Sequence, residues 1–120
     1  MELYEFSFGK VYVLQHDLGE VIVNNEADIN VLMVDELHEL LLSIFNGSFS
    51  LFINKSHSYS TQLDALVKFG KLPEIKKIAV YAPNELAKLS ADFAADIPSS
   101  SELDIEVFTD REEAMSWLQD

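Results

Sequence analysis

Apolar and polar residues alternate along the first quarter of the chain, which is the pattern of strands with one buried face. The aromatic side chains of the first run share one side of that strand: Tyr4, Phe6 and Phe8. Gly9-Lys10 is expected to form the next tight turn, because glycine reaches positive φ freely. A second turn is expected at residues 17–19. With strands at 11–14 and 20–24, residues 2–24 are predicted to form an antiparallel meander.

The spacing of apolar residues changes to that of an amphipathic helix from residue 29. One face is apolar and is formed by Val34, Leu37, Leu40, Leu41, Ile44 and Phe45. Asp28 or Asn30 is the expected N-cap, because short polar side chains accept the free N–H groups of a first turn. Gly47 is placed to end the helix.

Strand and helix patterns alternate in the second half of the chain. Strands are predicted at 49–54, 75–82 and 103–108, and a polar loop at 55–60. Thr61 with Asp64 resembles a capping box, so a helix is expected to begin there and to end near Gly70. Asn84 is expected to cap the next helix, and Thr109 with Asp110 the last one. The order is β-β-β-α-β-α-β-α-β-α.

Alternating strands and helices imply crossover connections and parallel pairing, whereas the opening meander is antiparallel. The sequence therefore predicts an α/β fold with a mixed sheet of five to six strands and four helices. At 120 residues, a single domain spanning 1–120 is expected.

Composition narrows the class of protein. Hydrophobic residues make up 48% of the chain and charged residues 24%, which excludes a disordered or low-complexity chain. There is no cysteine, so disulfides and thiolate catalysis are excluded. No apolar run approaches the roughly 18 residues of a membrane helix. The first residues do not read as a signal peptide, so integral membrane association is not expected and a cytoplasmic location is the simplest interpretation.

The net charge of −13 argues against nucleic acid and anionic lipid surfaces as partners, because both are polyanions. The charge is uneven. Residues 1–39 and 92–120 each carry nine acidic side chains and one basic one, whereas 40–91 carry six lysines and three acids. The middle segment therefore predicts either a locally basic face or solvated helix surfaces with a chance division of charge.

Three stretches carry a resemblance to a known family: YEFSFGKVYVL, LFINKSHSYSTQLDAL and IEVFTDREEAMSWLQD. With the element order, they resemble the STAS domain in its SpoIIAA-like (STAS/SEC14-like) form, in which a final strand leads into a short helix ending in Trp-Leu. The resemblance implies a STAS/SpoIIAA-like fold over nearly the whole chain. It also implies a regulatory module that binds a protein partner and is switched by phosphorylation of a Ser before the helix that follows the central strand.

The matching loop here is rich in hydroxyls but lacks the Asp-Ser pair and the Gly of the family motif. Its candidate phosphoacceptor or partner-binding residues are Ser56, His57, Ser58, Ser60 and Thr61. A phosphate in this loop would add about two negative charges at a helix start and could change partner binding. The alternative is plain capping, in which Ser60 or Thr61 accepts the first N–H groups of the helix.

Catalytic chemistry has little support in the sequence. His16, His38 and His57 show no i, i+4 spacing, so no metal site is predicted. Ser and His occur together in the loop, but the G-x-S-x-G turn of a nucleophile is absent. The four glycines are widely spaced, so no phosphate loop and no nucleotide cofactor are expected. A non-catalytic module is the expectation.

The SEC14-like branch of the resemblance implies an alternative, a small apolar-ligand binding protein with a lipid-like ligand. Helices 29–46 and 84–96 would then flank a pocket, and its possible lining is Phe45, Phe69 and Phe93. Tyr4, Phe6 and Phe8 are expected in the core, or alternatively at an exposed sheet edge that pairs two chains. A homodimer is compatible with either function.

Overall fold

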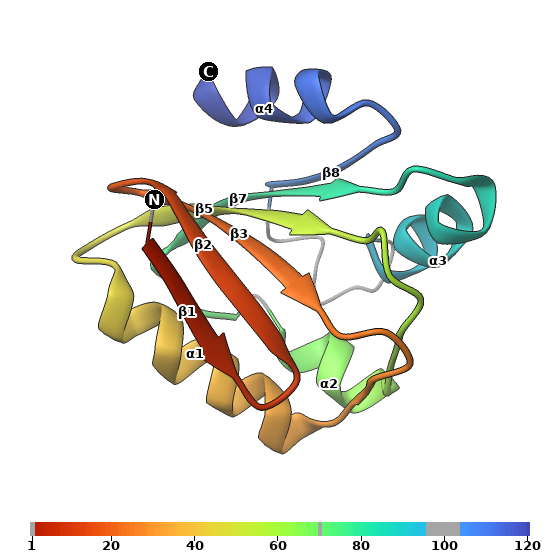
Figure 1. The fold of residues 1–120 in the computed structure, drawn as a ribbon, viewed down its shortest axis with the longest axis horizontal. Helices are drawn as coiled ribbons and strands as arrows, with labels where there is room; N and C mark the ends of the chain where they lie inside the picture. The colour runs from red at the N-terminus through yellow and green to blue at the C-terminus, as the bar shows by residue number, and fades with distance from the viewer. Residues whose placement is uncertain (1, 70, 96–103) are drawn as a thin grey trace.

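A computed structural model describes residues 2–69, 71–95 and 104–120, without the side chains of 86, 90 and 93–95. Its centre is a six-stranded mixed sheet of order β1-β2-β3-β5-β7-β8 (Figure 1). The strands are β1 (Glu2–Phe6), β2 (Gly9–Gln15), β3 (Leu18–Val23), β5 (Phe49–Asn54), β7 (Ile75–Tyr81) and β8 (Asp104–Phe108). The first three are antiparallel neighbours and the pairs β3–β5, β5–β7 and β7–β8 are parallel, so the predicted mixed α/β fold is confirmed.

The described residues form four helices around the sheet. They are α1 (Val31–Ile44), α2 (Leu63–Lys68), α3 (Glu85–Ala95) and α4 (Arg111–Gln119). In Figure 1, α4 lies on the opposite side of the sheet from α1 and α2, and α3 lies at the end beyond the β7 arrowhead. None of the described helices is long and apolar enough to cross a bilayer.

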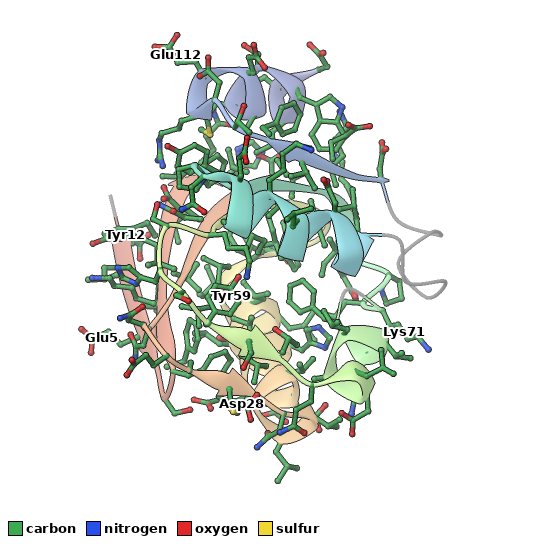
Figure 2. All side chains as sticks on the ribbon, turned by 90° about the vertical axis from the view of Figure 1, so that its right-hand side faces the viewer. Glu5, Tyr12, Asp28, Tyr59, Lys71 and Glu112 are labelled. Carbon is green, nitrogen blue, oxygen red and sulfur yellow. The ribbon has the colours of Figure 1, made fainter. Side chains whose placement is uncertain are left out.

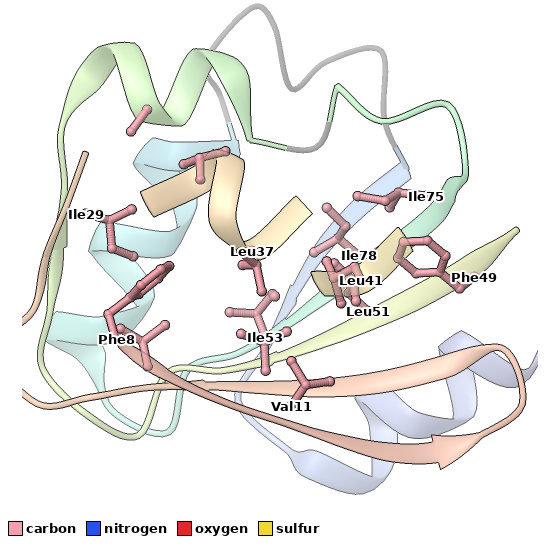
Figure 3. Packing of buried hydrophobic residues seen from close by; sticks show 14 of the residues in the cluster. Phe8, Val11, Ile29, Leu37, Leu41, Phe49, Leu51, Ile53, Ile75 and Ile78 are labelled. Atoms are coloured by element: carbon pink, nitrogen blue, oxygen red, sulfur yellow. The ribbon is translucent and has the colours of Figure 1, made fainter. Parts of the chain in front are cut away.

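The main core lies between the sheet and α1 and α2. Figure 3 shows Phe8 and Ile29 toward one end of this core and Phe49 and Ile75 toward the other. A smaller cluster on the other face joins Phe52, Ala79 and Ala114 beneath α4. Phe8 is buried and Phe6 is half-buried against the main core, whereas β1 is an edge strand.

Three of the predicted helix caps are confirmed. Asn30 accepts the N–H of Met33 at the start of α1, and Asn84 accepts that of Ala87 in α3. Asp110 accepts the N–H of Glu112 at the start of α4. Each cap depends only on neighbouring residues, which is why the local sequence predicts it.

Both predicted turns of the meander were wrong by about two residues. The chain turns at Ser7-Phe8 and at His16-Asp17, and Gly9 and Gly19 lie in strands. A Cβ at Gly9 would lie 2.3 Å from the carbonyl oxygen of Ile22. Glycine is therefore required there by the close approach of two backbones and not by a turn.

The predicted capping box at Thr61 was also wrong. Ser60 and Thr61 are the short strand β6 (Ser60–Thr61), which pairs in parallel with β4 (Asp28–Ile29). Because β6 is extended, α2 begins only after Gln62, whose side chain makes no capping hydrogen bond. The extra two-stranded ladder brings the starts of α1 and α2 together, and it forms part of the site described next.

Candidate functional site

A cavity of about 280 Å³ lies within the main core, near the carboxyl ends of the parallel strands. This is where open α/β sheets commonly bind ligands, because the loops that follow parallel strands diverge there. Its lining comes from the strands, from three helices and from β4 and β6, and is mostly apolar: Phe8, Val21, Val23, Ile29, Val34, Leu37, Ile53, Lys55, Tyr59, Ser60, Thr61, Leu66, Phe69, Ile78, Val80, Ala91 and Ile105. An apolar cavity of this size can take a small molecule.

The polar side chains of the lining all come from one segment, residues 55–61. The backbone N–H of Lys55 donates to the backbone carbonyl oxygen of Tyr81 at the end of β7. This bond fixes Lys55 at the point where β5 ends. Its ammonium lies 3.7 Å from the centre of the Tyr59 ring. Figure 2 shows Tyr59 toward the middle of the molecule, whereas Asp28 and Lys71 lie at its periphery.

Burial acts in opposite directions on these two groups. It lowers the pKa of the Lys55 ammonium and raises the pKa of the Tyr59 hydroxyl, because a low-dielectric environment disfavours each charged form. The ammonium is stabilised by the face of the ring through a cation–π contact. Within the described part of the chain, no acidic side chain lines the cavity and none forms an ion pair with Lys55.

The three serines predicted as candidates in this loop are exposed, and hydrogen bonds to other elements hold the loop in place. The Ser56 hydroxyl donates to the side-chain oxygen of Asn54 at 2.5 Å. The backbone N–H of Ser58 donates to the Asn25 side chain at 3.0 Å. The Ser60 hydroxyl donates to one carboxylate oxygen of Asp28, also at 3.0 Å. The loop is therefore fixed in place while its serines face solvent.

The two remaining loop candidates have different surroundings. His57 is exposed, and its Nδ1 is 2.9 Å from the Val23 carbonyl oxygen, which holds the ring over the end of β3. Thr61 is half-buried in β6 and lines the cavity. Ser60 also lines the cavity. The N-cap of α2 is Gln62, so neither Ser60 nor Thr61 caps this helix.

On the opposite face of the sheet, a polar network links this loop to α4. Glu20 is buried, and its carboxylate accepts two hydrogen bonds from Arg111 and one, at 2.9 Å, from the Asn54 amide. Asn54 also accepts from Ser56, so it connects the network to the loop. The Arg111 guanidinium lies 4.7 Å from the centre of the Phe52 ring.

The three phenylalanines predicted for a pocket have separate positions. Phe69, at the end of α2, lines the cavity. Phe45 is buried elsewhere in the core, stacked on Phe49 with 4.7 Å between ring centres. Phe93 falls in α3, but its side chain lies outside the described residues. Helices α1 and α3 both contribute to the lining, through Val34, Leu37 and Ala91.

The histidines and lysines do not gather into a site. The part of the chain that the structure describes holds no cluster of three potential metal ligands. Three lysines of the middle segment are engaged elsewhere: Lys68 with Asp35, Lys88 with Asp92, and Lys77 with the carbonyls of Trp117 and Asp120 at the end of α4. These contacts occupy half of the six lysines on which a locally basic face, one of the two alternatives, would depend.

Neither the pairing of Tyr59 with Lys55 nor the link between Glu20 and Arg111 was predicted from the sequence. Tyr59 is the one aromatic residue in the otherwise polar stretch KSHSYS, and that contrast was an available signal for an inward-facing side chain. Glu20 and Arg111 are 91 positions apart, so no local pattern connects them.

Comparisons with known proteins agree with this fold. The SpoIIAA-like family model matches residues 15–119. A crystal structure from Shewanella loihica PV-4, of an uncharacterized protein from the DUF3478 family with a SpoIIAA-like fold, is similar with a TM-score of 0.54 and 17% identity. The alignment covers 98% of this chain and 90% of that one. No curated protein sequence matches the chain. The predicted resemblance is confirmed, and the chain belongs to the SpoIIAA-like family.

Proposed function

We propose that the protein is a non-catalytic regulatory module that docks on another protein through loop 55–61 and the start of α2. SpoIIAA-like domains are commonly regulatory and typically interact with proteins. The observation that supports this surface is an exposed leucine beside the exposed serines. Leu63, the first residue of α2, is 62% exposed. An exposed apolar side chain at the start of a helix, next to a polar loop, matches the general plan of an interface with an apolar centre and a polar rim.

A hydroxyl of this loop would act as the switch, and Ser60 is the residue with the clearest physical consequence. Its hydroxyl lies 3.0 Å from the Asp28 carboxylate, across the pair β4–β6. A phosphate on Ser60 would place about two further negative charges against that carboxylate. Repulsion would then separate β6 from β4 and alter the docking surface. The lack of cysteine suits the cytoplasmic location that we propose for this role.

Peptide mapping of protein purified from its native host tests this function. Phosphate at Ser56, Ser58 or Ser60 is the expected result, and a loop without phosphate under all growth conditions would contradict the switch. The docking surface is tested separately by cross-linking in cells. Leu63→Ser should abolish the cross-linked protein complex, whereas Leu89→Ser, at a leucine 68% exposed on α3, should leave it intact. Equal loss in both variants would contradict the assigned surface.

A second candidate function, the binding of a small apolar molecule, is favoured by the cavity. Its lining is predominantly apolar, and its volume of about 280 Å³ exceeds the packing defects of an ordinary core. Native mass spectrometry of freshly purified protein tests this directly. A retained small molecule would support it, and the same spectrum would distinguish a monomer from a homodimer.

A further inference from the structure

The cavity contains one cationic side chain among its described lining residues, and that cation is Lys55. We propose that the cavity binds an amphiphile with a hydrocarbon chain and a single anionic head group, and that the Lys55 ammonium pairs with the head group. This inference rests on the second proposed function, apolar-ligand binding, and adds the charge of the ligand and the residue that recognises it.

The first support is the distribution of polarity. The polar lining residues are confined to Lys55, Tyr59, Ser60 and Thr61, which are neighbours in the chain and form one wall. The strands and helices around the rest of the cavity contribute apolar side chains. A site with one polar wall and an apolar remainder matches a molecule that is itself polar at one end.

The second support is the electrostatic state of Lys55. The ammonium is half-buried, lies against the Tyr59 ring and has no carboxylate partner in the described ranges. Asp28 lies across the β4–β6 pair from Ser60, and its two carboxylate oxygens accept hydrogen bonds from the side chains of Ser60 and Gln62. Burial lowers the pKa of Lys55, so its charged form lacks full compensation. An anionic head group would supply that compensation.

The third support is the contrast between this site and the rest of the molecule. With a net charge of −13, the protein repels anions over most of its surface. A cation inside an apolar cavity can therefore attract selectively those anions that carry a hydrocarbon chain into the cavity. The volume of about 280 Å³ lies at the small end of ligand pockets, which favours a single hydrocarbon chain of medium length.

Isothermal titration with four ten-carbon probes tests the inference. Decanoate and decyl phosphate carry an anionic head, 1-decanol is neutral, and decylamine is cationic. The protein variants are Lys55→Met, which keeps an apolar stem and removes the charge, and the control Lys71→Met, at an exposed lysine outside the cavity. Circular dichroism and melting temperature establish that both variants are folded.

We expect at least one anionic probe to bind the natural protein more tightly than 1-decanol and decylamine. Lys55→Met should weaken that probe about tenfold or more, because a charge-assisted contact is lost, and should leave 1-decanol unchanged. Lys71→Met should bind all probes as the natural protein does. The ratio between decanoate and decyl phosphate identifies a carboxylate or a phosphate head.

Two results would overturn the inference, and they differ in what they leave standing. If 1-decanol and the anions bind equally and Lys55→Met changes neither, the cavity binds apolar molecules but Lys55 does not recognise a head group. If none of the four probes binds, apolar-ligand binding itself fails. If Lys55→Met unfolds, acetylation of Lys55 in the folded protein, followed by the same titration, provides the test.

Discussion

The Arg111 guanidinium donates two hydrogen bonds to the Glu20 carboxylate, at 3.0 and 2.5 Å, and so joins the first residue of α4 to β3. The two partners are unequally buried. The Glu20 side chain is 6% exposed and that of Arg111 is 45% exposed. This inequality decides what each substitution should do, because a buried charge that loses its partner costs more than an exposed one.

Arg111→Ala should destabilise the protein more than Glu20→Gln. Without Arg111, the buried carboxylate keeps only the Asn54 amide, and we expect a loss of about 2–4 kcal/mol in the free energy of unfolding. Glu20→Gln leaves an arginine that water reaches, so about 1 kcal/mol is expected. Urea unfolding measures both, with the exposed Lys76→Ala as control. A larger loss in Glu20→Gln would contradict this ranking.

His38 should make stability depend on pH. It is 7% exposed between α1 and α2, and stacks on Phe69 with 5.9 Å between ring centres. Burial lowers its pKa from the ordinary value of 6.5, Asp35 opposes this, and Lys68 adds to it. The unfolded chain therefore takes up the proton first, so the contribution of neutral His38 is present above pH 6.5 and is lost as the pH falls below it.

His38→Phe removes the titratable imidazole and keeps an aromatic ring at the α1–α2 contact. Urea unfolding of both proteins at pH 7.5 and at pH 5.5 should show a larger loss of stability in the natural protein than in the variant. Parallel losses in the two proteins would show that other groups account for the pH dependence.

Gly9→Ala should be more harmful than Gly47→Ala, although Gly47 has a positive φ of +103°. A methyl group at residue 9 meets the Ile22 carbonyl oxygen at 2.3 Å and the Phe6 ring at 2.8 Å, so the β2–β3 ladder must shift. A methyl group at residue 47 meets no atom within 4 Å. Thermal unfolding should show a loss of about 1 kcal/mol for Gly47→Ala and clearly more for Gly9→Ala. Equal losses would contradict the close approach.

Ala91→Leu should fill part of the cavity and stabilise the protein without a ligand. Ala91 is buried in α3 and lines the cavity, so the larger side chain would bury added apolar surface and raise the free energy of unfolding by about 1 kcal/mol. The same variant should lose affinity for 1-decanol. Ala87→Leu, on the same helix but outside the lining, should keep that affinity. Unchanged 1-decanol binding in Ala91→Leu would show that the ligand lies elsewhere.

Local sequence patterns predicted much of the fold, because they depend on neighbouring residues. Asn30, Asn84 and Asp110 each cap the next helix through a backbone N–H two or three positions away. Asn84 and Asp110 were predicted, and Asn30 was one of two predicted alternatives for the first helix. The alternating and continuous apolar runs likewise located all six strands of the main sheet. The family resemblance depended on the order of these same elements, and the family model that matches residues 15–119 agrees with it.

The errors arose where distant segments determine the local conformation. Thr61 has the sequence of a helix start, but pairing with Ile29 extends it. Gly9 was predicted to lie in a turn, but glycine is required there because the backbone of Ile22 approaches closely. The cavity is lined by residues from Phe8 to Ile105, which lie far apart in the sequence. Spacing along the chain can suggest single candidate residues, but it cannot show that these residues meet around one cavity.

The pairing of β4 with β6 has a consequence for how the molecule opens. Each strand of this ladder has two residues, and the ladder is separate from the six-stranded main sheet. The ladder can therefore open in a local fluctuation that leaves the main sheet intact. The amides of Ser60 and Gln62, which donate to Ala27 and Ile29, should then exchange with deuterium well before those of β5. Ser60 and Thr61 line the cavity. The rate at which this four-residue ladder opens should therefore limit the rate at which a small molecule enters or leaves the cavity.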